Sequence, residues 1–180
     1  MRYLPALALL LALPACGQDA STPDKSEAAK PQSKALSAAI ADSADLKTLS
    51  GALASTGISA VFDGKASYTV LAPTDGAFAA LGDKGKALSQ PEEKPALAAV
   101  LRDHIVPGTL TREDIAKAIE ASGGKPVKMR TVGEGTVSFA KSGDDITVTG
   151  ADGSTAKIEG AAIAANNGVA LPISAVLKKV

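Results

Sequence analysis

Few residues in this chain could perform chemistry. The 180 residues contain one His, His104, and one Cys, Cys16. His104 could serve as a general base if Asp103 oriented its ring, but neighbours in an extended segment point to opposite faces. A single His without a Cys partner also cannot form a standard transition-metal site. We therefore predict that His104 is a packed, hydrogen-bonded residue where a helix meets a strand.

The carboxylates and glycines give no stronger signal. Asp144, Asp145 and Asp152 lack the spacing of an EF-hand loop, and each lies in a predicted turn, where Asp is common. Gly123 and Gly124 do not form a phosphate-binding loop. We therefore expect a protein that is not an enzyme and that needs no cofactor and no metal.

Composition narrows the range of partners. The chain has 19 basic and 19 acidic residues without a basic block, so the electrostatic footprint of a nucleic-acid-binding protein is absent. It has no Trp, two Tyr and three Phe, which argues against recognition by stacking on bases or sugar rings. We expect no nucleic-acid partner.

The N-terminal residues are typical of an exported protein. Residues 1–15 combine a positive start with an apolar run that is too short to span a bilayer, and they fit a signal peptide. The run ends in "LPAC", which resembles a bacterial lipobox with Cys16 as the lipidated residue. Residues 16–34 then read "CGQDASTPDKSEAAKPQSK", which predicts a flexible polar tether after the Cys. The alternative is an ordinary secretory signal that is cut near Ala15.

The lipobox resemblance implies a location. It implies cleavage before Cys16 and lipidation of its thiol, and two or more acyl chains hold a protein stably on a membrane. We expect an exported protein that is lipid-anchored to the cell envelope and faces the periplasm or the cell surface. Gly17 follows the Cys, which resembles the signal for transfer to the outer membrane in Gram-negative hosts.

A single folded domain is predicted over residues 35–180. A first helix precedes Ser43, which is predicted to cap a second helix, and Gly57 is placed to end that helix in a left-handed conformation. The apolar residues of both helices follow helical spacing: Leu36, Ile40, Leu46, Leu49 and Leu53.

The stretch "YTVLAPTDGAF" is predicted to switch from strand to helix. Pro73 cannot donate to a strand ladder and should end the strand. Thr74 suits a helix N-cap, and Asp75 in the first turn faces the positive end of the helix dipole. Phe78 has the spacing of a hydrophobic staple with Pro73, so we expect it to anchor the new helix in the core.

A further helix is predicted over residues 91–102, with a start at Pro95 as the alternative. After it, "HIVPG", which ends in Pro107 and Gly108, reads as a short strand or extended turn. The next helix begins with a capping box that uses Asp114 in place of Glu.

The second half of the chain alternates apolar and polar residues with period two. Four such runs are separated by "GEG", "SGD" and "ADG", which are turn signals. They predict an antiparallel meander with one buried and one wet face. Asn167 and Gly168 form a turn before a last strand. Helices followed by a meander indicate an α+β fold.

Three blocks of this sequence resemble the fasciclin (FAS1) domain. They are "YTVLAPTDGAF", "LAAVLRDHIVPGTLT" and "IAANNGVALPISAVL", and they occur in the family's order. The resemblance implies a β-wedge or sandwich of antiparallel strands with N-terminal and central helices packed on it. It also implies a non-enzymatic domain of the kind found at cell surfaces, where many members take part in adhesion or matrix contact.

This sequence departs from the family at several positions. Leu171 and Ser174 occupy the places of the usual His and Asp after the Asn-Gly-Val turn, and Asp103 replaces the usual Tyr. The Asp-Ile pair that is linked to integrin binding in some animal relatives reads Ala162-Ile163. Integrin-type adhesion is therefore not expected.

Two functions remain open at this point. One is a membrane-anchored interaction or adhesion-type module of the cell envelope, with a protein or matrix partner. The alternative is a carrier of an apolar small molecule, carotenoid-like or lipid-like, since some algal relatives bind carotenoids. The scarcity of aromatic residues argues against the carrier.

Overall fold

The computed structural model of the protein describes residues 34–178. The predicted signal peptide, Cys16 and most of the predicted tether lie outside these residues. The described helices are α1 (Leu36–Asp42), α2 (Lys47–Thr56), α3 (Asp75–Ala79), α4 (Asp83–Leu88), α5 (Lys94–Asp103) and α6 (Arg112–Ala121), with 3₁₀ turns η1 (Ile58–Asp63) and η2 (Pro91–Glu93). The strands are β1 (Tyr68–Pro73), β2 (Ile105–Pro107), β3 (Val127–Arg130), β4 (Thr136–Ser142), β5 (Asp145–Thr149), β6 (Thr155–Lys157), β7 (Ile163–Ala165) and β8 (Gly168–Ile173).

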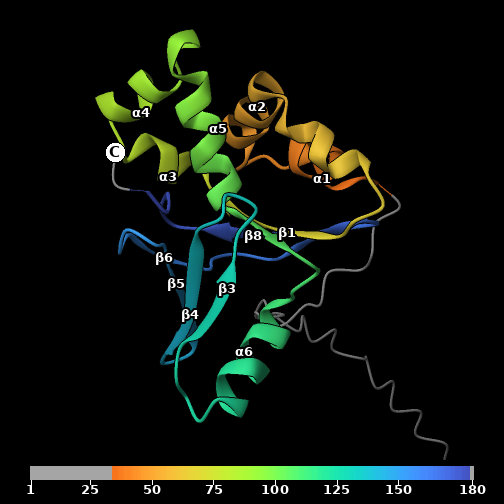
Figure 1. Ribbon diagram of the computed structural model, residues 1–180, viewed down its shortest axis with the longest axis vertical. Helices are drawn as coiled ribbons and strands as arrows, with labels where there is room; N and C mark the ends of the chain where they lie inside the picture. The colour runs from red at the N-terminus through yellow and green to blue at the C-terminus, as the bar shows by residue number, and fades with distance from the viewer. Residues whose placement is uncertain (1–33, 179–180) are drawn as a thin grey trace, which may run out of the picture.

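The strands form two sheets in a layered α+β fold, as predicted. The central sheet has the order β2-β1-β8-β7, and the outer sheet has the order β3-β4-β5-β6. Helices α1 to α5 cover one side of the central sheet, and the outer sheet and α6 lie on its other side (Figure 1). In the described part of the chain, no helix has the length and apolarity needed to cross a bilayer.

The central sheet contains one pairing that the sequence did not predict. β1 and β8 are parallel, with Val70 opposite Ala170 and Leu71 opposite Leu171. The expectation of antiparallel strands is therefore wrong at this pair, although β1–β2, β7–β8 and the outer sheet are antiparallel. Parallel strands are buried on both faces. This explains why β1 and β8 read as continuous apolar runs rather than alternating ones.

Two apolar cores flank the central sheet. The helices pack on one face around a cluster that includes Leu36, Leu49 and Leu101. On the other face, Leu71 and Leu171 of the central sheet join Ile115 and Ile119 of α6 and the inner side chains of the outer sheet. Strand alternation produces this division, because successive residues of β1 and β8 point to opposite faces.

Ser43 does not cap the second helix, contrary to the prediction. It is the C-cap of α1, and α2 begins four residues later, with Leu46 at the N-cap and no side-chain cap from its own segment. Leu46 is fully buried in the helical core. The cap of α2 comes instead from Asp75, a residue far along the chain. At the other end, Gly57 ends α2 in the predicted left-handed conformation, with φ 72°.

Phe78 is less buried than the sequence predicted. Its side chain is half-buried and packs against the edge of the helical core, whereas its neighbour Ala77 is buried. The helix that contains Phe78 is only five residues long, and a separate helix, α4, follows it. Phe78 therefore closes the rim of the core rather than anchoring a helix inside it.

Other predicted elements are present. A 3₁₀ turn over Pro91–Glu93 precedes the central helix, α5, which has Pro95 in its first turn. The helix begins at Lys94, between the predicted start at residue 91 and the alternative start at Pro95. Thr111 and Asp114 form both hydrogen bonds of the capping box at the start of α6. The four alternating runs form the antiparallel outer sheet.

Candidate functional site

The strand-to-helix joint at the end of β1 ties three elements together. β1 ends at Pro73, and the Ala77 amide donates to the Thr74 hydroxyl at 3.2 Å, so Thr74 caps α3 as predicted. The Thr74 amide also donates to the carbonyl of Ile173 in β8, at 3.2 Å. The Thr74 side chain and backbone are therefore used to hold the joint.

Asp75 caps a helix other than its own. The amides of Thr48 and Lys47, at the start of α2, donate to its two carboxylate oxygens at 2.7 and 3.3 Å. The Asp75 amide donates back to the carbonyl of Asp45 at 2.8 Å. Burial raises the pKa of Asp75, but the hydrogen bonds from Thr48 and Lys47 outweigh it and hold the pKa below its ordinary value. A carboxylate at a helix N-terminus is stabilised by the helix dipole as well.

His104 is buried and both of its ring nitrogens are occupied. The residue is 1% exposed. Nδ1 lies 2.7 Å from the carbonyl of Val100, and the Leu177 amide donates to Nε2 at 2.9 Å. The ring is therefore neutral, with its proton on Nδ1. Burial lowers the pKa of His104, against smaller opposing effects from Val100 and nearby carboxylates. His104 closes α5 as its C-cap and fastens the C-terminal segment to it.

The turn after His104 is fixed from β1. Pro107 pairs with Tyr68, and the Gly108 amide donates to the carbonyl of Ser67 at 2.8 Å. Gly108 has φ 93°, which favours Gly. Its carbonyl accepts from the hydroxyl of Thr69, which in turn accepts from the Leu110 amide, at 2.7 and 2.8 Å. Thr69 is fully buried, and sequence reasoning missed its role because it looks like an ordinary strand residue.

Asn167 and Gly168 join the last hairpin to the N-terminal helices. The Leu36 amide, at the start of α1, donates to the side-chain oxygen of Asn167 at 2.8 Å, and the Asn167 side-chain amide donates to the carbonyl of Phe62. A Cβ at Gly168 would collide with the carbonyl of Tyr68 in the adjacent strand. Only Gly allows β1 and β8 to approach this closely at the start of their pairing.

The polar groups of the signature residues form hydrogen bonds within the folded domain. In the part of the chain that the structure describes, every buried side-chain nitrogen and oxygen has a hydrogen-bond partner. Over the same residues, no three His, Cys, Asp or Glu side chains lie close enough to hold a metal ion. The signature residues all lie at junctions between elements, where they contact the protein's own backbone. They are Pro73, Thr74, Asp75, His104, Pro107, Gly108, Asn167 and Gly168.

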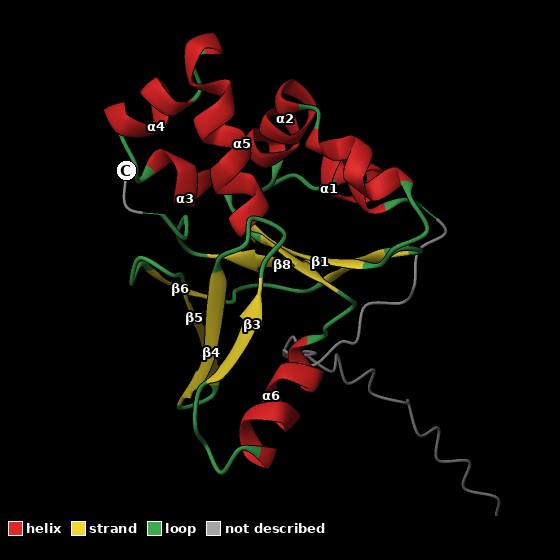
Figure 2. Cartoon of the chain, in the orientation of Figure 1, coloured by secondary structure: helices red, strands yellow, loops and turns green. Residues whose placement is uncertain are grey.

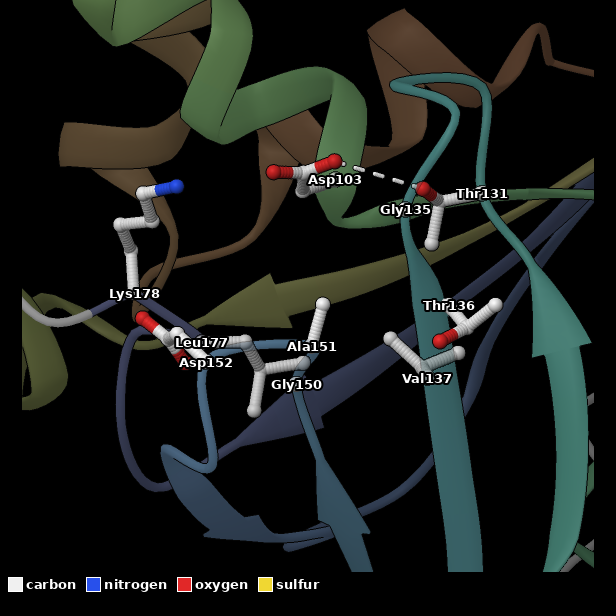
Figure 3. A pocket seen from close by; sticks show the side chains of 10 residues that line it. All are labelled: Asp103, Thr131, Gly135, Thr136, Val137, Gly150, Ala151, Asp152, Leu177 and Lys178. Atoms are coloured by element: carbon white, nitrogen blue, oxygen red, sulfur yellow. Dashed lines mark hydrogen bonds between the residues drawn. The ribbon is translucent and has the colours of Figure 1, made fainter.

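A hollow of about 220 Å³ with both polar and apolar walls lies beside His104, between the end of α5 and one end of the outer sheet (Figure 3). Asp103, Asp152 and Lys178 line it, together with Thr131 and the backbone of the β3–β4 and β5–β6 turns. Asp103 accepts from the Thr131 hydroxyl at 3.4 Å, and Asp152 accepts from the amide and hydroxyl of Ser154 at 2.9 and 2.6 Å.

The lining of this hollow gives it limited chemistry. Its two carboxylates and one ammonium are not accompanied by a thiol, and the nearby His104 faces Val100 and Leu177 instead. Gly133 and Gly135 bring their backbone against the Asp103 carboxylate, so larger residues there would meet it. Gly at both positions therefore allows the "GEG" turn to pass this close to the end of α5. The volume also falls short of the 300–1,000 Å³ that is typical of small-molecule sites.

A second hollow, of about 240 Å³, lies among the helices. Phe78, Leu88 and Leu97 give it apolar walls, and Thr48 and Ser55 of α2 lie at its edge. It is also smaller than typical ligand sites. Neither hollow therefore has the size of a pocket for an extended apolar molecule.

The residues that depart from the fasciclin pattern near the end of the chain have packing roles. Leu171 is fully buried within β8. Ser174 accepts a hydrogen bond from the Lys157 amide at 2.9 Å and so joins the C-terminal segment to β6. Ala162 and Ile163 pack partly buried against the two cores rather than presenting a carboxylate.

Comparison with known proteins agrees with this description. A sequence model of the fasciclin domain matches residues 44–179. Among solved structures, a pair of FAS1 domains from the insect cell adhesion molecule fasciclin I has the same fold, with a TM-score of 0.58 at 21% sequence identity. The match covers 74% of this chain and 45% of that one. The chain belongs to the fasciclin-domain family.

Proposed function

We propose that this protein is a non-enzymatic interaction module that is held at the cell envelope by a lipid on Cys16. The observation that carries the proposal is that the signature residues form structural hydrogen bonds within the domain. His104, the only His in the chain, is buried with both nitrogens occupied, and Thr74, Asp75 and Asn167 are engaged by backbone groups. These signature residues have structural roles, so we infer that the domain acts through its surface.

Family membership supports an interaction role. The related structure comes from a cell adhesion molecule, and the described hollows are small for a carrier of apolar molecules. The proposed partner is a component of the envelope or matrix. The Asp-Ile pair that would suggest integrin-type contact is absent here, because Ala162 precedes Ile163.

The lipid anchor is tested by Cys16→Ser. We expect this variant to leave the membrane fraction, since the acyl chains that hold the protein would be missing. Ala15→Val, at the residue before the Cys, is a useful companion, because a bulky residue there should block cleavage while the thiol remains. Membrane fractionation of Cys16→Ser equal to that of the parent protein would refute the lipid anchor.

The interaction role is tested by chemical crosslinking in intact cells followed by mass spectrometry. We expect specific adducts with an envelope component that are lost when the cells express the Cys16→Ser form. Recovery of no specific adduct would count against the interaction role. A spectrum and lipid extract of the protein purified from its own cells would test the carrier alternative, which a colourless and ligand-free protein would exclude.

A further inference from the structure

The outer face of the outer sheet carries a regular array of hydroxyl groups. Strand alternation turns Val137, Phe139 and Val148 into the core, where they are buried. The residues between them point the other way, toward solvent. Six of these outward residues bear hydroxyls. Leaving aside Ser142 at the end of β4, we name the other five the hydroxyl face: Thr136, Ser138, Thr147, Thr149 and Thr155.

The strand register lines these hydroxyls up across the sheet. Ser138 of β4 lies opposite Thr149 of β5, which lies opposite Thr155 of β6. Lys128 of β3 lies opposite Ser138 and extends the same row to the edge strand. Since neighbouring strands are about 4.8 Å apart, this row spans about 14 Å. Figure 2 shows the strands that carry it, on the far side of the central sheet from α1 to α5.

Most of these hydroxyls have no hydrogen-bond partner among the residues that the structure describes. Thr147 donates to the carbonyl of Ala140 at 3.2 Å. For the other four, the described residues 34–178 provide no hydrogen bond. A Thr or Ser hydroxyl can both donate and accept. The face therefore offers a ladder of groups that match the hydroxyls of a sugar polymer.

Cations border the hydroxyl face on both edge strands. Lys128 and Arg130 on β3 are exposed, and neither forms an ion pair with a described residue. Lys157 on β6 is 59% exposed and pairs at 3.4 Å with Asp145, the carboxylate on this face. On the strands themselves, these three outward cations accompany one outward carboxylate, Asp145. The other nearby carboxylates, Glu134, Asp144 and Asp152, lie in the turns at the ends of the strands.

We propose that the hydroxyl face and its bordering cations bind an anionic, carboxylate-bearing polysaccharide of the envelope or matrix. Lys128, Arg130 and Lys157 would meet the carboxylates, and the hydroxyls would meet the sugar rings between them. Protein hot spots are rich in Trp, Tyr and Arg, and single-stranded nucleic acids stack on aromatic side chains. The outward residues of β3 to β6 include no aromatic residue. The face therefore offers no platform for stacking on bases or sugar rings, and its contacts with a glycan would be hydrogen bonds and ion pairs.

The test uses the full-length protein on a sensor surface, with polygalacturonate as the probe. Polyphosphate of matched charge and duplex DNA serve as polyanions without a sugar chain of this kind, and dextran serves as the neutral glycan. We expect binding of polygalacturonate that weakens with added salt, because exposed charges are screened. Equal or tighter binding of polyphosphate or DNA would overturn the proposal, as would no binding of polygalacturonate.

Two pairs of variants separate charge from hydroxyls. Lys128→Glu with Arg130→Glu should weaken polygalacturonate binding by about tenfold or more, since each cation near an anionic surface contributes about fivefold. Lys65→Glu with Lys94→Glu makes the same change of charge on exposed residues near the helices and should leave binding nearly unchanged. Equal losses in the two double variants would show that only net charge matters and would overturn the site.

Thr149→Val with Thr155→Val removes two hydroxyls while keeping β-branched side chains of nearly the same shape. We expect about threefold weaker polygalacturonate binding for each hydroxyl lost, with no change for polyphosphate. An unchanged affinity for polygalacturonate would overturn the role of the hydroxyls.

The glycan inference rests on the proposed interaction function, but the two can fail separately. If polygalacturonate does not bind while crosslinking in cells recovers a specific protein partner, the interaction function stands and the glycan inference is wrong. If the polymer binds to the hydroxyl face while Cys16→Ser stays on the membrane, the glycan site stands and the lipid anchor is wrong.

Discussion

The joint around β1 and β8 differs from the outer face of the outer sheet in how its polar groups are used. At the joint, Thr74, Asp75 and Asn167 each bind backbone groups of other elements. On the hydroxyl face, the side chains of Ser138 and Thr149 lie in register, and neither has a hydrogen-bond partner within residues 34–178. The joint contains the motifs that mark the family, whereas the face contains no motif at all. In this chain the signature residues therefore hold elements of the fold together, whereas the proposed recognition surface lies elsewhere.

The sharpest way to break the joint is Gly168→Ala. The added Cβ would meet the carbonyl of Tyr68, which belongs to the backbone of the adjacent strand and cannot move aside. We expect a loss of about 3 kcal/mol or more in the free energy of unfolding, measured by denaturant melts. Gly51→Ala is the control, because it lies in α2 with open space around its position. It should gain about 0.5–1 kcal/mol, and similar losses in both variants would contradict the account.

Removing the His104 ring should also destabilise the protein strongly. His104→Phe leaves the Leu177 amide and the Val100 carbonyl without their ring partners. Since an unsatisfied buried group costs about 1–3 kcal/mol, we expect a loss of about 2–4 kcal/mol in urea melts. Arg102→Ala, at the exposed residue two positions earlier, should stay within about 0.5 kcal/mol. A His104→Phe variant as stable as the parent would show that the ring is not needed.

His104 should make stability depend on pH in one direction. Burial lowers its pKa in the folded protein below the value of about 6.5 that it has when unfolded. Well above pH 6.5 neither state binds the proton, so there this group contributes no pH dependence. As the pH falls below 6.5, the unfolded state takes up the proton first and stability decreases until the folded pKa is reached. Melts of the parent and of His104→Phe at pH 7.5 and 5.5 measure the effect, which should be absent in the variant.

Asp75→Ala should have a smaller effect at the same joint. The change removes the cap that Asp75 provides for the amides of Thr48 and Lys47, and loss of a cap costs about 1 kcal/mol. Asp75→Asn keeps an oxygen acceptor and should lose less. Since its folded pKa is depressed, the stability that the carboxylate contributes is present above its unfolded pKa and is lost as the pH falls through the folded pKa. An Asp75→Ala protein with unchanged stability would contradict the cap.

The face should tolerate changes that the joint does not. Lys128→Glu with Arg130→Glu alters exposed residues without described ion pairs, so each change should stay within about 0.5 kcal/mol. Thermal melts of the double variant test this. A loss comparable with that of Gly168→Ala would mean that the face is also structural, and the contrast between the two regions would disappear.

Local signals in the sequence predicted much of this fold. The stop at Pro73, the cap at Thr74, the left-handed Gly57 and the capping box at Thr111 each depend on residues within a few positions of each other, and all are present. The period-two runs predicted the outer sheet. These features could be predicted because the physics that determines them acts over one or two turns of chain.

Features that depend on distant parts of the chain could not be predicted in the same way. The parallel pairing of β1 with β8 joins residues about a hundred positions apart, and Asp75 caps a helix that begins 28 residues earlier. Local preferences predicted Ser43 as that cap, because Ser is a common N-cap residue. Alternation showed that the outer sheet has a wet face, but the register that aligns Ser138, Thr149 and Thr155 comes only from the structure.

The most direct test of the central claim is site-specific photocrosslinking in intact cells. A photoreactive amino acid is placed at Ser138 on the hydroxyl face or at Ala96, an exposed position on α5, in the full-length protein. We predict that Ser138 gives an adduct of high mass that is sensitive to polysaccharide digestion, and that Ala96 does not. Adducts from Ala96 with none from Ser138 would contradict the claim that the outer sheet is the recognition surface.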